Sequence, residues 1–210
     1  MKHRIIGDSV QTVAIELNAG EGVFSRLGSL LFVKGAVKSE SNPEGPYWAV
    51  LAEALTPVDE IPLVLYKCES GGGLIGFSTS GPGRIHHVNL DGTMRMIVRR
   101  TAIITATDGI TCEKLYLEGE DTSDVPKNLF VTLSGSGQAW LHGPGNLVDF
   151  TLGPDECVVV DGNMILGYQG DIIPAPKPVG KPDQDGPLPY ILFMHVTGPG
   201  RLILNTMRQD

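Results

Sequence analysis

The sequence has little charge and no long apolar run. Charged residues make up 19% of the chain, and 24 acidic residues against 16 basic ones give a formal charge of −8. No stretch of Lys and Arg offsets that charge locally, so nucleic acid is an unfavourable partner because its phosphates would be repelled. No apolar run approaches the roughly 18 residues of a membrane span or forms a signal-peptide core. We therefore expect a cytoplasmic protein with no direct membrane span.

Cysteine is also scarce. Cys68, Cys112 and Cys157 are odd in number and widely separated, so they suggest neither a disulfide framework nor a CxxC metal site. We expect reduced, mostly buried thiols. The abundant residues are instead 27 Gly and 15 Pro, which favour many short strands joined by tight turns. The composition predicts an all-β protein in one domain over residues 1–210.

An internal repeat runs through the chain. Glycine motifs begin at Gly71, Gly135 and Gly198, about 63 residues apart, and each leads into a short apolar segment that we interpret as a turn followed by a strand. Strands ending at Leu17, Leu90 and Leu152 can also be aligned. The sixteen residues after those leucines then align without a gap: NAGEGVFSRLGSLLFV, DGTMRMIVRRTAIITA and GPDECVVVDGNMILGY.

These matches predict three tandem copies of one β-sandwich or short double-stranded β-helix module, with pseudo-threefold symmetry. We place the modules at about 1–38 plus 190–210, 63–117 and 128–173. In this interpretation the C-terminal strand 201–206 completes the module begun by the N-terminal strand 10–17. Alternation supports strands, because Val13, Ile15 and Leu17, like Val148, Phe150 and Leu152, fall on one face that should line a core.

Three irregular insertions interrupt the repeat, at 39–62, 118–127 and 173–189. The first contains Tyr47–Leu55, the one segment that we predict to be helical, between Pro46 and Pro57. The second is an acidic loop. The third contains six prolines from Ile173 onward, which predict an extended excursion on the surface.

One repeat position carries hydrogen-bonding residues in all three modules: Ser78, His142 and Asn205. They could cap the glycine turns, or they could form a polar ligand-binding ring on the symmetry axis. A second repeat position, at the corner between two strands, holds Arg26, Arg99 and Asp161, which we interpret as solvated turn residues rather than an ion pair between modules.

The histidines raise the alternative of a metal site. The segment from Gly153 to Met164 resembles the turn and strand of the second cupin motif, but no histidine stands at the ligand position. His86 and His87 are adjacent and should point to opposite faces of a strand, whereas cupin ligands alternate. We predict no catalytic residue, no metal ligand and no cofactor, and retain His87 as a candidate ligand-binding residue.

The segments LNAGEGVFSRLGSLLFVKG, SGPGRIHHVNLDGTMRMIVRRTAIITAT, LSGSGQAWLHGPGNLVDFTLGPDECVVVDGNMILGYQ and FMHVTGPGRLILNT resemble the family named for altered inheritance of mitochondria. The resemblance implies a β module like that of the tryptophan RNA-binding attenuator protein, tripled in one chain, and ring-like oligomers. It carries over no catalytic residue.

Two functional hypotheses follow. The first is a non-catalytic assembly, scaffold or binding protein that acts as a homo-oligomer, most favourably a trimer, because closed assemblies cover exposed strand edges. Its contact surface could be a module edge or the apolar residues Tyr47, Trp48, Leu51 and Leu55. The alternative is a cupin-like metal-dependent enzyme or small-ligand-binding protein that uses His86, His87 or His142.

Overall fold

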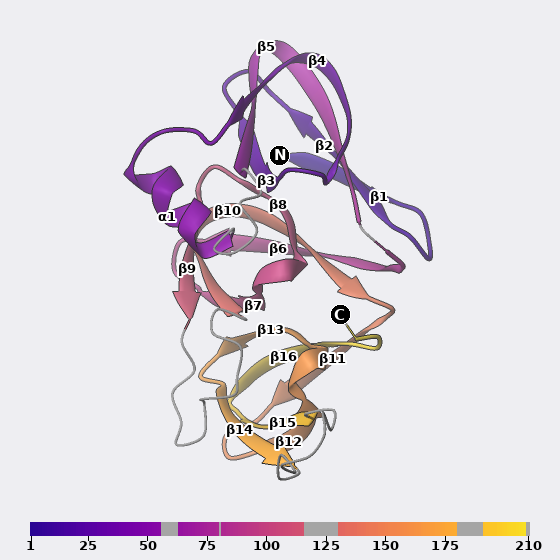
Figure 1. Ribbon diagram of the computed structural model, residues 1–210, viewed down its shortest axis with the longest axis vertical. Helices are drawn as coiled ribbons and strands as arrows, with labels where there is room; N and C mark the ends of the chain where they lie inside the picture. The colour runs from indigo at the N-terminus through magenta and orange to yellow at the C-terminus, as the bar shows by residue number, and fades with distance from the viewer. Residues whose placement is uncertain (56–62, 80, 116–129, 180–190, 209–210) are drawn as a thin grey trace, which may run out of the picture.

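The computed structural model describes residues 1–210 except 56–62, 80, 116–129, 180–190 and 209–210. Nearly all of its elements are β-strands, which confirms the all-β class. The elements form three tiers along the longest axis of the molecule: β1–β5, then β6–β10 with helix α1, then β11–β16 (Figure 1).

The first tier is organised by β5, which pairs antiparallel with β2, β3 and β4. Its strands are β1 (Lys2–Ile6), β2 (Thr12–Leu17), β3 (Gly22–Arg26), β4 (Leu30–Ser41) and β5 (Leu63–Ser78). Val13, Ile15 and Leu17 on β2 are at most 2% exposed. The alternation in the sequence therefore predicted the core face of this strand correctly.

The second tier is organised in the same way by β10, which pairs with β6, β7, β8 and β9. Its elements are β6 (Gly83–Asp91), β7 (Met96–Arg99), the 3-10 turn η1 (Arg100–Ala102), β8 (Ile103–Thr107), β9 (Ile110–Leu115) and β10 (Phe130–Pro144). Helix α1 (Pro46–Leu55) lies against β9 and confirms the predicted helix. The predicted acidic loop 118–127 lies outside the described residues.

The third tier has β16 between β11 and β13, and a separate sheet in the order β12-β15-β14. Its elements are β11 (Leu147–Leu152), β12 (Cys157–Asp161), the 3-10 turn η3 (Gly162–Met164), β13 (Ile165–Gly170), β14 (Ile173–Val179), β15 (Ile191–Thr197) and β16 (Gly200–Asn205). The first part of the predicted proline-rich excursion is strand β14 rather than a free surface segment, and residues 180–189 lie outside the described residues. Proline is tolerated there because β14 is an edge strand.

Two sequence predictions about the strands were wrong. The glycines at Gly71 and Gly135 do not end a turn but lie inside the long strands β5 and β10. Their φ angles of +67° and +92° let each strand bend between its two sets of partners. Val148 was expected in the core but is 40% exposed, because β11 pairs only with β16 among the described strands and leaves this side chain near an open edge.

Strand register recurs at the aligned positions of the three tiers. The last strand of each tier pairs with the first, and the same aligned residues face each other: Leu17↔Gly73, Leu90↔Gly137 and Leu152↔Gly200. The last strand also pairs with the third, with a register shift just after the same pair: Leu30↔Phe77, Ile103↔Leu141 and Ile165↔Leu204. A close approach favours glycine at these sites, since a Cβ on Gly137 would overlap the Thr107 side chain.

Neighbouring tiers are joined by one further antiparallel pairing. The second strand of a tier pairs with the third strand of the next tier, β3 with β8 and β7 with β13. The aligned residues again face each other: Val23↔Thr107, Phe24↔Ala106 and Ser25↔Thr105 in one junction, and Met96↔Gln169, Ile97↔Tyr168 and Val98↔Gly167 in the other. The tiers therefore join into one continuous β body.

The predicted closure of the termini was wrong. β16 pairs with β11 and β13 of its own tier, the third. β2 lies in the first tier and pairs there with β1 and β5. The opening strand that the first module was thought to lack is supplied locally by β5. Because each tier completes its own pairing, the C-terminal strand has no vacancy to fill beside residues 10–17.

Candidate functional site

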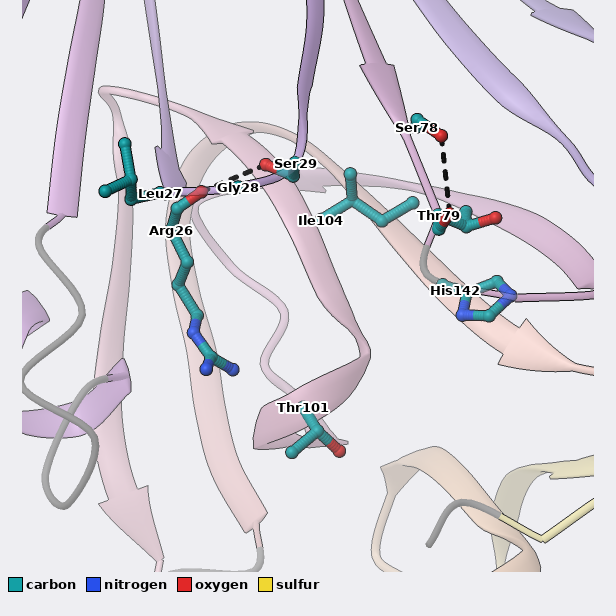
Figure 2. Close-up of a pocket in the computed structure, with 9 residues that line it drawn as sticks. All are labelled: Arg26, Leu27, Gly28, Ser29, Ser78, Thr79, Thr101, Ile104 and His142. Carbon is teal, nitrogen blue, oxygen red and sulfur yellow. Dashed lines mark hydrogen bonds between the residues drawn. The ribbon is translucent and has the colours of Figure 1, made fainter.

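A cavity of about 320 Å³ lies where the first two tiers meet. The first tier contributes the loop between β3 and β4 and the end of β5, and the second contributes η1, β8 and the end of β10 (Figure 2). The lining residues are Arg26, Leu27, Gly28, Ser29, Ser78, Thr79, Thr101, Ile104 and His142. Two of them, Ser78 and His142, belong to the repeat position that the sequence singled out.

The hydroxyl groups at this cavity are held by the backbone. Ser78 Oγ donates to the Thr79 carbonyl at 3.3 Å, and Ser29 Oγ donates to the Arg26 carbonyl at 3.0 Å (Figure 2). Thr79 Oγ1 lies 3.0 Å from the Gly81 carbonyl and 3.3 Å from that of Gln11. These bonds use the hydroxyl protons and leave the oxygens with lone pairs that can accept hydrogen bonds.

His142 is the most buried polar residue of the cavity wall. His142 is only 7% exposed, and among the described residues no hydrogen bond within the distance and angle limits reaches its Nε2. Desolvation lowers the pKa of the imidazole below 6.5, although the Gly81 and Pro82 carbonyls oppose that shift. The ring rests on Gly83, where a Cβ would overlap Nε2. The lowered pKa favours the neutral form of the His142 imidazole. Its ring lies across the cavity from the guanidinium of Arg26 (Figure 2).

Asn205, the third member of the repeat position, occupies the corresponding place one junction further along. It is 3% exposed, and a Cβ on Gly143 would lie 2.8 Å from its Oδ1. Neither its Oδ1 nor its Nδ2 has a partner within the described part of the chain. The structure thus brings Ser78 and His142 to one cavity and leaves Asn205 outside it.

His87 lies on a different surface. Its ring is 4.2 Å from the ring of His3 and 5.4 Å from that of Trp140, and Nε2 is 3.2 Å from Gln138 Oε1. Desolvation and the neighbouring His3 lower its pKa. His86 turns the other way, toward Arg201 and Asp149, so the two histidines do point to opposite faces.

Over the described residues, no three His, Cys, Asp or Glu side chains come together as a metal-binding group. Cys68 and Cys112 are buried free thiols as expected, whereas Cys157 is exposed. Within the same residues, no helix has the length and apolar content that crossing a bilayer requires.

The segment Tyr47–Leu55 packs largely against its own chain. Leu51 and Leu55 are each 1% exposed, and Tyr47 Oη donates to the Ile110 carbonyl at 2.6 Å. Trp48 meets Phe24 edge to face at 6.0 Å and is half-buried. A contact of this segment with a second copy stays a prediction, for which Val50, at 48% exposure, offers the free apolar side chain.

Arg99 was misjudged from the sequence. It was expected to be solvated but is 3% exposed, and its Nε and Nη2 donate to the carbonyls of Ile165 and Gly162 at 3.1 and 2.6 Å. The guanidinium carbon also lies 5.4 Å from the centre of the Phe130 ring. Burial lowers the pKa of Arg99 to about 10. In the sequence, the observation that could have indicated a structural role for Arg99 was that it shares a repeat position with a second arginine, Arg26.

A second surface combines apolar side chains with an open strand edge. Leu30, Leu31 and Val33 at the start of β4 are 40%, 55% and 40% exposed. The aligned residues in the other tiers are at most 6% exposed: Ile103, Ile104 and Ala106 in β8, and Ile165, Leu166 and Tyr168 in β13. β8 and β13 each have a strand on both sides, whereas β4 pairs only with β5 among the described strands.

Comparison with known proteins gives a family match and a fold match. A family model described as Mitochondrial biogenesis AIM24 matches residues 3–207. The chain is also similar to a Streptococcus pyogenes protein of known crystal structure, with a TM-score of 0.77 and 15% identity over 99% of this chain and 94% of that one. At that identity the likeness shows the fold alone. No curated protein matches the chain in sequence.

Proposed function

Because the chain belongs to the family described as Mitochondrial biogenesis AIM24, we propose that it is a non-catalytic assembly or binding protein that acts as a symmetric, β-rich homo-oligomer. The proposal includes three copies of one β module in the chain. The recurrent strand registers and the aligned 3-10 turns η1 and η3 support that repeat.

The open edge of β4 is the observation that carries the proposed assembly. Leu30, Leu31 and Val33 stand beside backbone groups that have no strand partner on that side among the described residues. Such an edge is a template for pairing with another chain, and proteins that keep one exposed normally blunt it with charge, proline or a cover. From Leu30 to Val33 this edge carries only apolar side chains, so self-association stabilises it.

A closed ring is the favoured form of the assembly, and three chains the favoured number. A ring covers every copy of the edge, whereas an open chain always leaves one exposed. The net charge of −8 supports a protein partner over a nucleic acid, and the free thiols of Cys68, Cys112 and Cys157 support a reducing, cytoplasmic compartment.

Light scattering after size exclusion tests the proposal. A single species of about three times 22.5 kDa, unchanged over a tenfold dilution, is the expected result. A dimer would agree with the proposed self-association but contradict the proposed trimer. A monodisperse species of one chain overturns the proposal.

The cavity between the first two tiers supports a second candidate function, the binding of a small polar or anionic ligand. Arg26 contributes a cationic side chain to the lining, His142 is 7% exposed, and Ser29, Ser78 and Thr79 contribute hydroxyl groups. Thermal denaturation with millimolar phosphate, acetate and citrate provides the test. A rise in Tm that is lost in Arg26→Met supports the site, and no shift with any of the three removes it.

A further inference from the structure

Both junctions between tiers form by the same strand pairing, and two of the described strands lack the partner that this pairing would give them. The second strand of a tier pairs with the third strand of the tier that follows, as β3 does with β8 and β7 with β13. By position, β12 is the second strand of the last tier and β4 is the third strand of the first. Within the described chain, β12 pairs only with β15 and β4 only with β5.

These two strands cannot meet within one molecule. β4 lies at one end of the long axis and β12 at the other, with the second tier between them (Figure 1). Each has apolar side chains that the aligned strands bury. Val159 on β12 is 53% exposed, whereas its aligned residue in β3, Phe24, is 0% exposed and packed in the junction with β8.

We propose that β12 of one molecule pairs antiparallel with β4 of a second copy, head to tail, and so repeats between chains the junction that joins the tiers within a chain. This inference rests on the proposed self-assembly and names its surfaces. The register follows from the two junctions already present, because the same aligned residues face each other in both. It places Val159 opposite Val33, with Val158 opposite Lys34 and Val160 opposite Phe32.

The chemistry of the two edges agrees with this register. Val159 and Val33, two exposed valines, would cover each other as a cross-strand pair, which strands favour. Glu156, just before β12, would lie opposite Ala36, with Lys34 and Lys38 as its diagonal neighbours. Like charges do not face each other anywhere along these positions. The occupant of the β4 edge is therefore a second copy of this chain rather than an unrelated strand.

Cysteine cross-linking tests the pairing directly. Opposite residues of an antiparallel pair have Cα atoms about 4.5–5.5 Å apart, which is within disulfide range. The background carries Cys157→Ser, because that native thiol is exposed, while Cys68 and Cys112 are buried. Val33→Cys and Val159→Cys are placed on separately tagged chains and co-expressed, then oxidised mildly and run on a non-reducing gel.

The expected result is a cross-linked dimer that contains one chain of each tag, and no cross-link when either variant is expressed alone. Pairing Val33→Cys with Val148→Cys is the matched control, since Val148 is 40% exposed on β11, a strand that takes no part in the proposed pairing. A disulfide dimer of Val33→Cys alone would show a symmetric interface and overturn the head-to-tail pairing. Equal cross-linking in the control would overturn it as well.

The test separates this inference from the proposed function. An oligomer by light scattering that gives no Val33–Val159 cross-link retains self-assembly and overturns the β12–β4 interface. A monomer overturns both. Val159→Lys provides a second measurement: we expect at least a tenfold weaker association with unchanged circular dichroism, and unchanged association for Val148→Lys. Unweakened association of Val159→Lys contradicts the inference.

Discussion

Arg99 and Gly162 connect the second and third tiers through a side chain, because the guanidinium Nη2 of Arg99 donates to the Gly162 carbonyl at 2.6 Å. The same side chain reaches the Ile165 carbonyl, so it binds the turn η3 at both of its ends. A buried cation that satisfies backbone carbonyls of the neighbouring tier fixes the geometry of the junction beside the β7–β13 pairing.

Replacing Arg99 should therefore destabilise the protein strongly. We expect Arg99→Met to lower the free energy of unfolding by about 2–4 kcal/mol, since it leaves buried carbonyls without donors. Arg4→Met, on the exposed side of β1, should change it by less than about 0.5 kcal/mol. Urea denaturation measures both, and equal stability of the two variants would show that the contact is dispensable.

His142 should make the free energy of unfolding depend on pH in the acidic range. Its pKa in the folded protein lies below the ordinary 6.5, so the unfolded chain binds the proton first as pH falls. Stability is full above pH 6.5 and declines below it. His3, His86 and His87 are shifted in the same direction. His142→Asn should flatten the decline between pH 6.5 and 5 in denaturant titrations, and an unchanged slope would exclude His142 as a contributor.

Substitutions of Trp48 and Val50 on α1 should distinguish an effect on folding from an effect on association. Trp48→Asp places a carboxylate against Phe24 and should lower the free energy of unfolding by about 2–4 kcal/mol. Val50→Asp, at an exposed position, should leave the Tm nearly unchanged. Calorimetry and light scattering on both variants check this. Dissociation by Val50→Asp with an intact fold would place the helix in an interface.

Gly83 and Gly81 offer a matched test of the cavity wall. A Cβ at Gly83 would overlap the His142 ring and the Gly143 carbonyl, whereas a Cβ at Gly81 meets no described residue within 4 Å. We expect Gly83→Ala to cost about 1–3 kcal/mol of stability and Gly81→Ala to be close to neutral. Chemical denaturation gives both values. A neutral Gly83→Ala would mean that the His142 ring can move aside.

The sequence predicted features that depend on local patterns. Alternation predicted the core face of β2, and the prolines around Tyr47–Leu55 predicted the segment that forms α1. Predictions that needed long-range pairing failed. The prediction that the C-terminal strand completes the first module was wrong because β5, which follows the 39–62 insertion, pairs with β2.

The candidate site was only partly predictable for a similar reason. The repeat position of Ser78 and His142 was visible in the sequence, but their meeting in one cavity depends on how two tiers join. Arg99 was judged from the usual solvation of charged turn residues, and its burial follows from the η3 carbonyls that only the fold brings near. Leu31 and Ile104 are both apolar. They differ in burial because β8 has a strand on both sides and β4 does not among the described strands.

The covalent linkage of the tiers changes how concentration acts on their junctions. The pairings of β3 with β8 and β7 with β13 join segments of one polypeptide, so each forms at an effective concentration set by the connecting chain. Diluting the protein leaves both junctions intact. Chains cut between the tiers would have to find each other by diffusion, and their reassembly would depend on the square or the cube of the fragment concentration.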